Sequence, residues 1–160
     1  MKIALDTNIF ICALEDKTKV GRQASDLIKK IKKDALQAYI SVLAVQEFMV
    51  KVYENGQDEM VGEYLEFLSG GGLITIVNFE RDIALKAAKI RAASLLDNKS
   101  GKSPKIQTPD SIHLATALYT KAKVFYTTEK GLPKRIENME IKVFMTRSDF
   151  TSVVSFQHSG

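Results

Sequence analysis

The chain is short of the residues that build disulfides and zinc sites. It has one cysteine, two histidines, three prolines and no tryptophan among 160 residues. A single cysteine excludes an intrachain disulfide. Its apolar neighbours Phe10, Ile11 and Ala13 indicate that Cys12 is a buried thiol rather than a nucleophile. Two histidines and one cysteine cannot form a tetrahedral zinc site by themselves.

The chain also lacks a long hydrophobic run. No apolar segment reaches the roughly 18 residues needed to span a bilayer. Asp6 interrupts the apolar N-terminal segment and no small-residue cleavage site follows, which argues against a signal peptide. Together with the single cysteine, this predicts a cytoplasmic protein with no membrane partner. The formal net charge of +4 permits an acidic partner such as RNA without requiring one.

What is present is enough apolar material for one buried core, since hydrophobic residues make up 45% of the sequence. No repeat, low-complexity tract or linker divides the chain. We therefore assign residues 1–150 to a single domain and residues 151–160 to a C-terminal tail that frays.

Short apolar runs alternate with amphipathic segments along the chain. The apolar runs predict strands at residues 3–5, 39–40, 73–77, 124–127 and 141–145. Periodicity and capping residues predict helices that start near residues 9 and 21 and others over 41–53, 58–68, 80–96 and 108–121, with a polar loop at 97–107. This alternation predicts an α/β fold with three layers, α/β/α, in which helices cover both faces of a mostly parallel sheet.

Acidic residues fall where such a sheet gathers its ligands, at the carboxyl ends of the strands. Asp6 follows the first predicted strand, Asp110 opens a helix before the strand at 124–127, and Glu129 comes just after that strand. Glu47 lies among the apolar residues of a helix. Buried carboxylates repel one another unless a cation holds them, and hard oxygen ligands suit Mg²⁺ or Mn²⁺.

Such a cluster suits phosphodiester hydrolysis, because a divalent cation lowers the pKa of water and neutralises charge on the phosphate. One ion or two would serve. Each acid also has a structural explanation: Asp6 as a helix cap, Asp110 as a charge favoured by the helix dipole, Glu47 as a surface residue and Glu129 as a turn residue. His113, one turn after Asp110, is more typical of a packed or hydrogen-bonded histidine than of a general base.

Four segments, in this order along the chain, resemble the PIN-domain ribonucleases, and in particular the VapC-type toxins of bacterial and archaeal toxin–antitoxin pairs. The first and third are the most specific of them. The segments are residues 3–8 (IALDTN), 41–48 (SVLAVQEF), 108–117 (TPDSIHLATA) and 125–129 (FYTTE).

The resemblance implies an endonuclease that cuts RNA with the help of Mg²⁺ or Mn²⁺. Its catalytic and metal-binding residues would be Asp6, Glu47, Asp110 and Glu129. Supporting roles would fall to Asn8, Thr127 and Thr128. The resemblance further implies a homodimer, and inhibition by a partner antitoxin whose segment enters the acidic site.

The sequence departs from the family pattern at two places. Glu129 stands where the family usually has Asp. The loop at 98–107 is longer than usual, and its residues Lys99, Lys102 and Lys105 would either touch RNA phosphates or lie in solvent.

Two other functions stay open from the sequence. One is a PIN-like module that binds RNA or a protein without cutting, which the Glu129 departure favours. The other is a phosphoacceptor enzyme with Asp6 as its nucleophile. Asn8 counts against the second, because such enzymes usually carry another acid two residues after the nucleophile.

Overall fold

The computed structural model describes residues 1–15 and 17–144. The predicted tail at 151–160 and the end of the last predicted strand, Met145, lie outside these residues. The helices and strands, in chain order, are β1 (Lys2–Leu5), α1 (Thr7–Glu15), α2 (Lys19–Asp34), β2 (Gln37–Ser41), α3 (Val42–Glu54), η1 (Asp58–Met60), α4 (Val61–Leu68), η2 (Gly70–Gly72), β3 (Ile74–Val77), α5 (Arg81–Lys99), α6 (Thr108–Tyr119), β4 (Val124–Thr127), β5 (Arg135–Ile136) and β6 (Met139–Val143).

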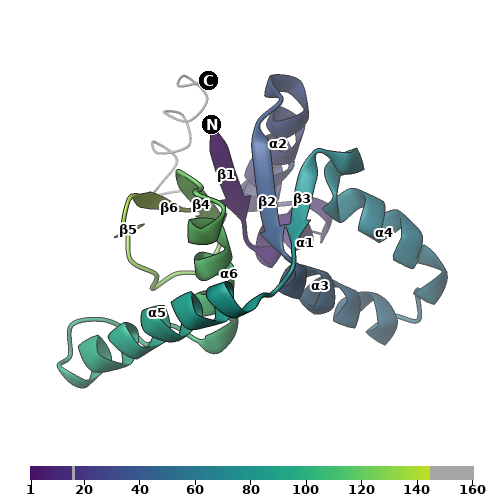
Figure 1. Cartoon of the computed structure of the whole chain (residues 1–160). Coiled ribbons are helices and arrows are strands. Elements are labelled where there is room, and N and C mark those ends of the chain that lie inside the picture. The colour runs from purple at the N-terminus through teal and green to yellow at the C-terminus, as the bar shows by residue number, and fades with distance from the viewer. Residues whose placement is uncertain (16, 145–160) are drawn as a thin grey trace.

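The strands form one sheet in the order β3-β2-β1-β4-β6-β5. Every neighbouring pair is parallel except β5 and β6, which are antiparallel. The carboxyl ends of the parallel strands therefore lie at one end of the sheet, beside the start of α1 and α3 (Figure 1). This is where the acidic residues are expected to meet.

Helices cover both faces of the sheet, as the sequence predicts. On one face the side chains of β1, β2 and β4 pack with helices α1 to α4 in a core that includes Phe10, Leu27 and Tyr126. On the other face Ala4 and Phe125 pack against α5 and α6, through residues such as Ile83 and Leu114. The three-layer α/β/α architecture is thereby confirmed.

The register of β1 and β4 brings two distant parts of the chain together. Leu5 lies opposite Tyr126. Just beyond, the backbone N–H of Asp6 donates to the carbonyl of Tyr126 at 2.9 Å. The first residue after β1 and the last residue of β4, Thr127, are therefore neighbours.

Helix boundaries near the site differ from the predictions by a few residues. Helix α1 begins at Thr7 rather than near Ile9, with the N–H of Thr7 donating to Asp6 Oδ1. Ser41 caps α3 as predicted, because its hydroxyl accepts from the N–H of Leu43 at 3.1 Å. Helix α6 starts at Thr108 itself, so Gln107 rather than Thr108 is the capping residue.

Helix α5 ends three residues later than predicted, at Lys99. The hydroxyl of Ser100 donates to the carbonyls of Leu96 and Asp97, which extends the last turn. Lys99 is therefore part of a helix and not of the loop to which its sequence assigned it. Helix α6 ends at Tyr119 instead of residue 121, since Lys121 has a left-handed backbone with φ of 60°.

The C-terminal strands also differ from the prediction. Strand β6 begins two residues earlier, at Met139, because it pairs with the short strand β5. A two-residue strand such as β5 carries too little periodic signal to be predicted.

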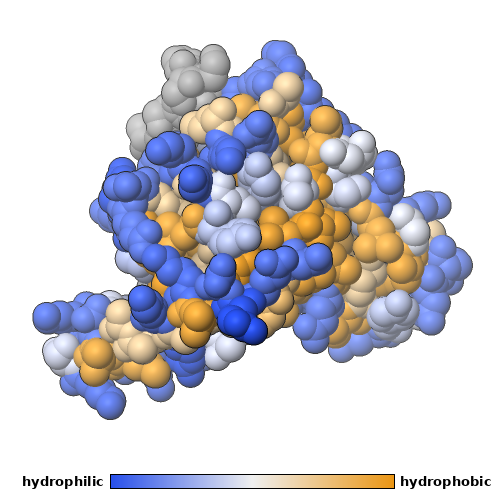
Figure 2. Space-filling model, viewed as in Figure 1, coloured by the Kyte–Doolittle hydropathy of each residue, from blue (hydrophilic) through white to orange (hydrophobic). Residues whose placement is uncertain are grey.

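Helix α5 projects from the body of the molecule, and apolar patches lie among hydrophilic residues along it (Figures 1 and 2). Leu85 and Leu96 are large apolar residues of this helix that are exposed. Cys12 is partly buried against the first core, which agrees with a packed thiol. Within the described residues, the structure contains no helix with the length and apolarity to cross a bilayer.

Candidate active site

Asp6 is the most deeply buried acid of the predicted set, with only 4% of the residue exposed. It sits between β1 and α1, and hydrogen bonds fix both of its carboxylate oxygens. Oδ1 accepts from the N–H of Thr7 at 2.7 Å, and Oδ2 accepts from the hydroxyl of Thr127 at 2.7 Å. The Asp6 carboxylate therefore has a defined orientation at the carboxyl end of the sheet.

Thr127 connects Asp6 with the segment that follows β4. Its side chain is fully buried, and its hydroxyl accepts from the backbone N–H of Glu129 at 2.9 Å while donating to Asp6. This holds the backbone of Glu129 close to Asp6, while the residue as a whole stays exposed. Thr128 between them is partly buried, as is Asn8 on α1.

Asp110 is the third residue of α6 and lies within electrostatic reach of the other acids. Partial burial and the negative charges of Asp6, Glu129 and Glu47 raise its pKa to about 6, against a smaller opposing effect of His113. Burial and nearby like charges both disfavour the ionised form of a carboxylate. The structure thus brings all four predicted acids into one electrostatic cluster.

Glu47, on α3, is held by two hydrogen-bond donors. The hydroxyl of Thr7 donates to its Oε1 at 2.7 Å, and Nε2 of His113 lies 2.5 Å from the same oxygen. Partial burial opposes ionisation, but the bonds from His113 and Thr7 outweigh it and hold the pKa of Glu47 below its usual value. Glu47 is therefore an ionised carboxylate in a fixed position.

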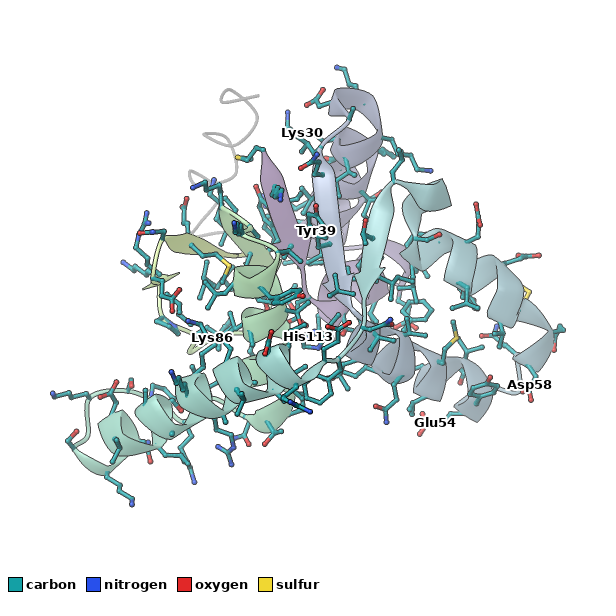
Figure 3. The ribbon with its side chains drawn as sticks, in the orientation of Figure 1. Lys30, Tyr39, Glu54, Asp58, Lys86 and His113 are labelled. Atoms are coloured by element: carbon teal, nitrogen blue, oxygen red, sulfur yellow. The ribbon has the colours of Figure 1, made fainter. Side chains whose placement is uncertain are left out.

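His113, on α6, lies at the carboxyl end of the sheet (Figure 3). Its side chain is 2% exposed, and Nε2 is 3.8 Å from Asp6 Oδ1. Burial favours the neutral ring, but the bond to Glu47 and the negative charges of Asp6, Glu47 and Asp110 raise the pKa of His113. The sequence-based interpretation of a hydrogen-bonded histidine is confirmed.

The sequence did not indicate a role for Thr7. It also did not predict that His113 pairs with Glu47. Thr7 follows directly after Asp6, and His113 lies one helical turn from Asp110, so their positions in the motifs were a usable signal. Glu47 is 66 residues from His113, and only the packing of α3 beside α6 brings them together.

The three lysines predicted to meet RNA are all exposed. Lys99 closes α5, and Lys102 and Lys105 lie in the segment that leads to Asp110 at the start of α6. Their contact with RNA stays a prediction.

The chemistry of the donors fits a hard divalent cation, since all four candidate ligands are carboxylates. Their mutual repulsion, seen at Asp110, is what a cation would relieve. Within residues 1–15 and 17–144, no three histidine, cysteine, aspartate or glutamate side chains are arranged to hold one ion together. A cation here would be held by fewer protein ligands, with water completing its coordination, which is common for Mg²⁺.

Fold and site together define a three-layer α/β protein with an acidic cluster where its parallel strands end. The model of the PIN domain family matches residues 3–137, most of the chain. The protein belongs to the PIN domain family, and the resemblance stated from four short segments is confirmed at that level.

Several solved structures share the fold. VapBC2 from Rickettsia felis, bound to a DNA fragment from its promoter, is 20% identical, with a TM-score of 0.67 over 89% of this chain and 98% of that one. A toxin–antitoxin complex from Klebsiella pneumoniae is 23% identical, with a TM-score of 0.57 over 87% and 99%. DNA-bound VapBC from Salmonella typhimurium is 17% identical, with a TM-score of 0.65 over 89% and 98%. No curated protein matches the chain.

Proposed function

We propose that this protein is an endoribonuclease that depends on Mg²⁺ or Mn²⁺, acts in the cytoplasm, and is the toxin of a type II toxin–antitoxin pair. Asp6 and Asp110 would be its principal metal ligands. Glu47 and Glu129 would complete the acidic site, and Asn8, Thr127 and Thr128 would support it.

One observation carries the proposal: the acidic cluster at the carboxyl ends of β1 and β4 is short of positive charge. Partial burial, followed by the negative charges of Asp6, Glu129 and Glu47, raises the pKa of Asp110 to about 6. His113 opposes this shift, but the pKa of Asp110 stays raised. A protein that keeps so many carboxylates together gains most from a ligand of high positive charge.

A divalent cation bound in this cluster would supply a more acidic water molecule and neutralise charge that develops on a phosphodiester. The protein's own part is positioning. Thr7 and Thr127 hold Asp6 in one orientation, and the start of α6 carries Asp110 beside it. Glu47, fixed by Thr7 and His113, would orient a water molecule for attack on the phosphate. Exposed Glu129 would act through water.

Cleavage of RNA by the purified protein tests this proposal. The wild type should cut a structured RNA in Mn²⁺ or Mg²⁺ and stop when the metal is chelated. Asp6→Asn and Asp110→Asn should each abolish cleavage while circular dichroism shows an intact fold. Wild-type cleavage by both folded variants would rule out the assigned site.

An antitoxin partner and a homodimer belong to the same proposal. Support comes from the shared fold with the toxin–antitoxin complex from Klebsiella pneumoniae. Co-expression with the product of a small adjacent reading frame should yield a stable complex with suppressed cleavage. Light scattering of the free protein should give twice the mass of one chain. Full activity in the presence of that product would remove the toxin assignment but leave the nuclease.

Lys99, Lys102 and Lys105 are proposed to contact RNA phosphates near the site. Replacing all three with alanine should lower the slope of log affinity against log salt concentration by about 2, from about 0.7 for each lost contact. Lys32→Ala and Lys33→Ala make a matched control, since these exposed lysines end α2 and precede β2 at the other end of the sheet. An unchanged slope would show that the three lysines do not contact RNA phosphates.

A second candidate is a PIN-like module that binds RNA or a protein without cutting. The observation in its favour is that no three potential ligands in the described residues converge on one ion, and that Glu129 is exposed. Protein freed of any partner that binds RNA without Mn²⁺-dependent cleavage would establish this function. The phosphoacceptor alternative is disfavoured, because Asp6 is almost fully buried with both oxygens hydrogen-bonded and Asn8 follows it.

A further inference from the structure

Thr7, Glu47 and His113 form a hydrogen-bonded group that joins three helices, and Glu47 is also a member of the acidic cluster. Thr7 on α1 donates to Oε1 of Glu47 on α3, and His113 on α6 approaches the same oxygen at 2.5 Å. Nε2 of His113 also lies 3.4 Å from the Thr7 hydroxyl. These residues come from parts of the chain up to 106 residues apart.

Within the described residues, the polar contacts that orient the His113 ring are those of Nε2. A carboxylate oxygen only accepts, so Nε2 carries the hydrogen and donates to Glu47. Nδ1 is buried and has no hydrogen-bond partner within the described part of the chain. Burying a polar nitrogen without a partner costs free energy, which a role in packing alone does not explain. Of the distances from Nε2 to Glu47, Thr7 and Asp6, the one to Glu47 is the shortest, at 2.5 Å.

The geometry also rules out a direct catalytic role for the ring. With 2% of its side chain exposed, His113 lies behind Glu47, whose side chain is 36% exposed. A substrate in solvent would meet Glu47 first. Thr7 then links the two acids, since its backbone N–H holds Asp6 and its hydroxyl holds Glu47.

We propose that His113 is a positioning residue, which holds the Glu47 carboxylate beside Asp6 through its Nε2–H. The inference rests on the proposed cation site and adds to it. Two donors on Oε1 leave Glu47 one orientation relative to Asp6, so that Asp6 and Asp110 hold the cation and Glu47 acts on the water around it. Residues that orient the surroundings of a metal in this way typically change affinity or activity by about 10- to 100-fold when replaced.

A pair of amide variants tests the assignment. In His113→Gln the side-chain amide donor sits near the position of Nε2 and can still reach Glu47. In His113→Asn the amide ends near the position of Nδ1, so the donor to Glu47 is lost. Both replacements are neutral and polar, which makes each a control for the other's effect on folding.

Mn²⁺ affinity of the full chain, measured by calorimetry, and the dependence of RNA cleavage on Mn²⁺ are the readouts. We expect His113→Asn to weaken Mn²⁺ binding and cleavage by about 10-fold or more. His113→Gln should retain most of both, with equal urea stability in the two variants. A residue that only fills space would affect the two variants alike.

Equal losses in the two variants, or none in either, overturn the inference. Wild type that binds Mn²⁺ without cutting RNA refutes the nuclease but leaves the Mn²⁺ affinities to decide the role of His113. Wild type that binds no Mn²⁺ refutes the cation site and this inference with it.

Discussion

At the scale of single residues, the central feature is a hydroxyl that connects two acids. Thr127 is fully buried, donates to Asp6 and accepts from the N–H of Glu129. Its loss would leave a buried carboxylate oxygen and a backbone donor without partners. The side chain therefore links the stability of the sheet's carboxyl end to the geometry of the site.

Replacing Thr127 with valine keeps the shape and removes the hydroxyl. We expect this variant to lose about 2 kcal/mol of unfolding free energy, because a buried oxygen of Asp6 loses its donor and the partly buried N–H of Glu129 loses its acceptor. Urea denaturation at neutral pH measures the loss. Thr127→Ser, which keeps the hydroxyl, is the matched control. Equal stability of the two variants would contradict the role given to the hydroxyl.

Asp110 gives a pH-dependent prediction. Its pKa is raised to about 6, so the folded protein takes up this proton more readily than the unfolded chain. Through this group, the metal-free protein gains stability as the pH falls from about 6 toward 4, and the charged carboxyl is destabilising above pH 6.

Asp110→Asn should therefore stabilise the metal-free protein at pH 8. We expect a gain of about 1 kcal/mol, less than the full pKa shift would give, because Asp110 is partly exposed and water screens the repulsion. At pH 4 the two proteins should be equally stable. The difference also includes a smaller effect through His113, because Asp110 is the last of the charges that raise its pKa. A variant that is less stable than wild type at pH 8 would contradict the charge cluster.

At the scale of elements, the segment between α5 and α6 sets the position of Asp110. Ile106 is anchored on both sides of its backbone: its N–H donates to the Ser94 hydroxyl at 2.7 Å, and its carbonyl accepts from Arg91 at 3.1 Å. Both partners lie on α5. This anchor fixes the chain four residues before Asp110, at the start of α6.

Ser94→Ala removes one half of this anchor and leaves a buried N–H unsatisfied. We expect a loss of about 1.5 kcal/mol in unfolding free energy and faster proteolysis between residues 100 and 107. Ser100→Ala is the control, because the exposed Ser100 hydroxyl donates only to carbonyls at the end of α5. Equal behaviour of the two variants would show that the anchor does not order this segment.

Elements were predicted well where a local pattern specifies them. The strand at 124–127 is clearly marked by its apolar run, and Ser41 by its position before a helix. Lys99 was misassigned because α5 continues through the polar residues Asp97, Asn98 and Lys99, where no apolar repeat marks a helix. Strand β5 was missed since two residues become a strand only through pairing with β6.

At the scale of the whole molecule, the sheet order is what assembles the site. Strands β1 and β4 are neighbours in the sheet, although 118 residues of the chain lie between Leu5, the end of β1, and Val124, the start of β4. The motifs predicted which acids gather at this end. They did not predict which donors hold each oxygen, because the contacts of Glu47 with Thr7 and His113 depend on how three helices pack.

The stability of the protein with and without Mn²⁺, measured by urea denaturation at pH 8, tests the central claim most directly. If the acidic cluster binds the ion, wild type should gain about 2.7 kcal/mol at a Mn²⁺ concentration 100 times its dissociation constant. Asp110→Asn should start from a higher stability and gain little. A wild type that Mn²⁺ does not stabilise, or an Asp110→Asn variant that gains as much as wild type, would contradict the account.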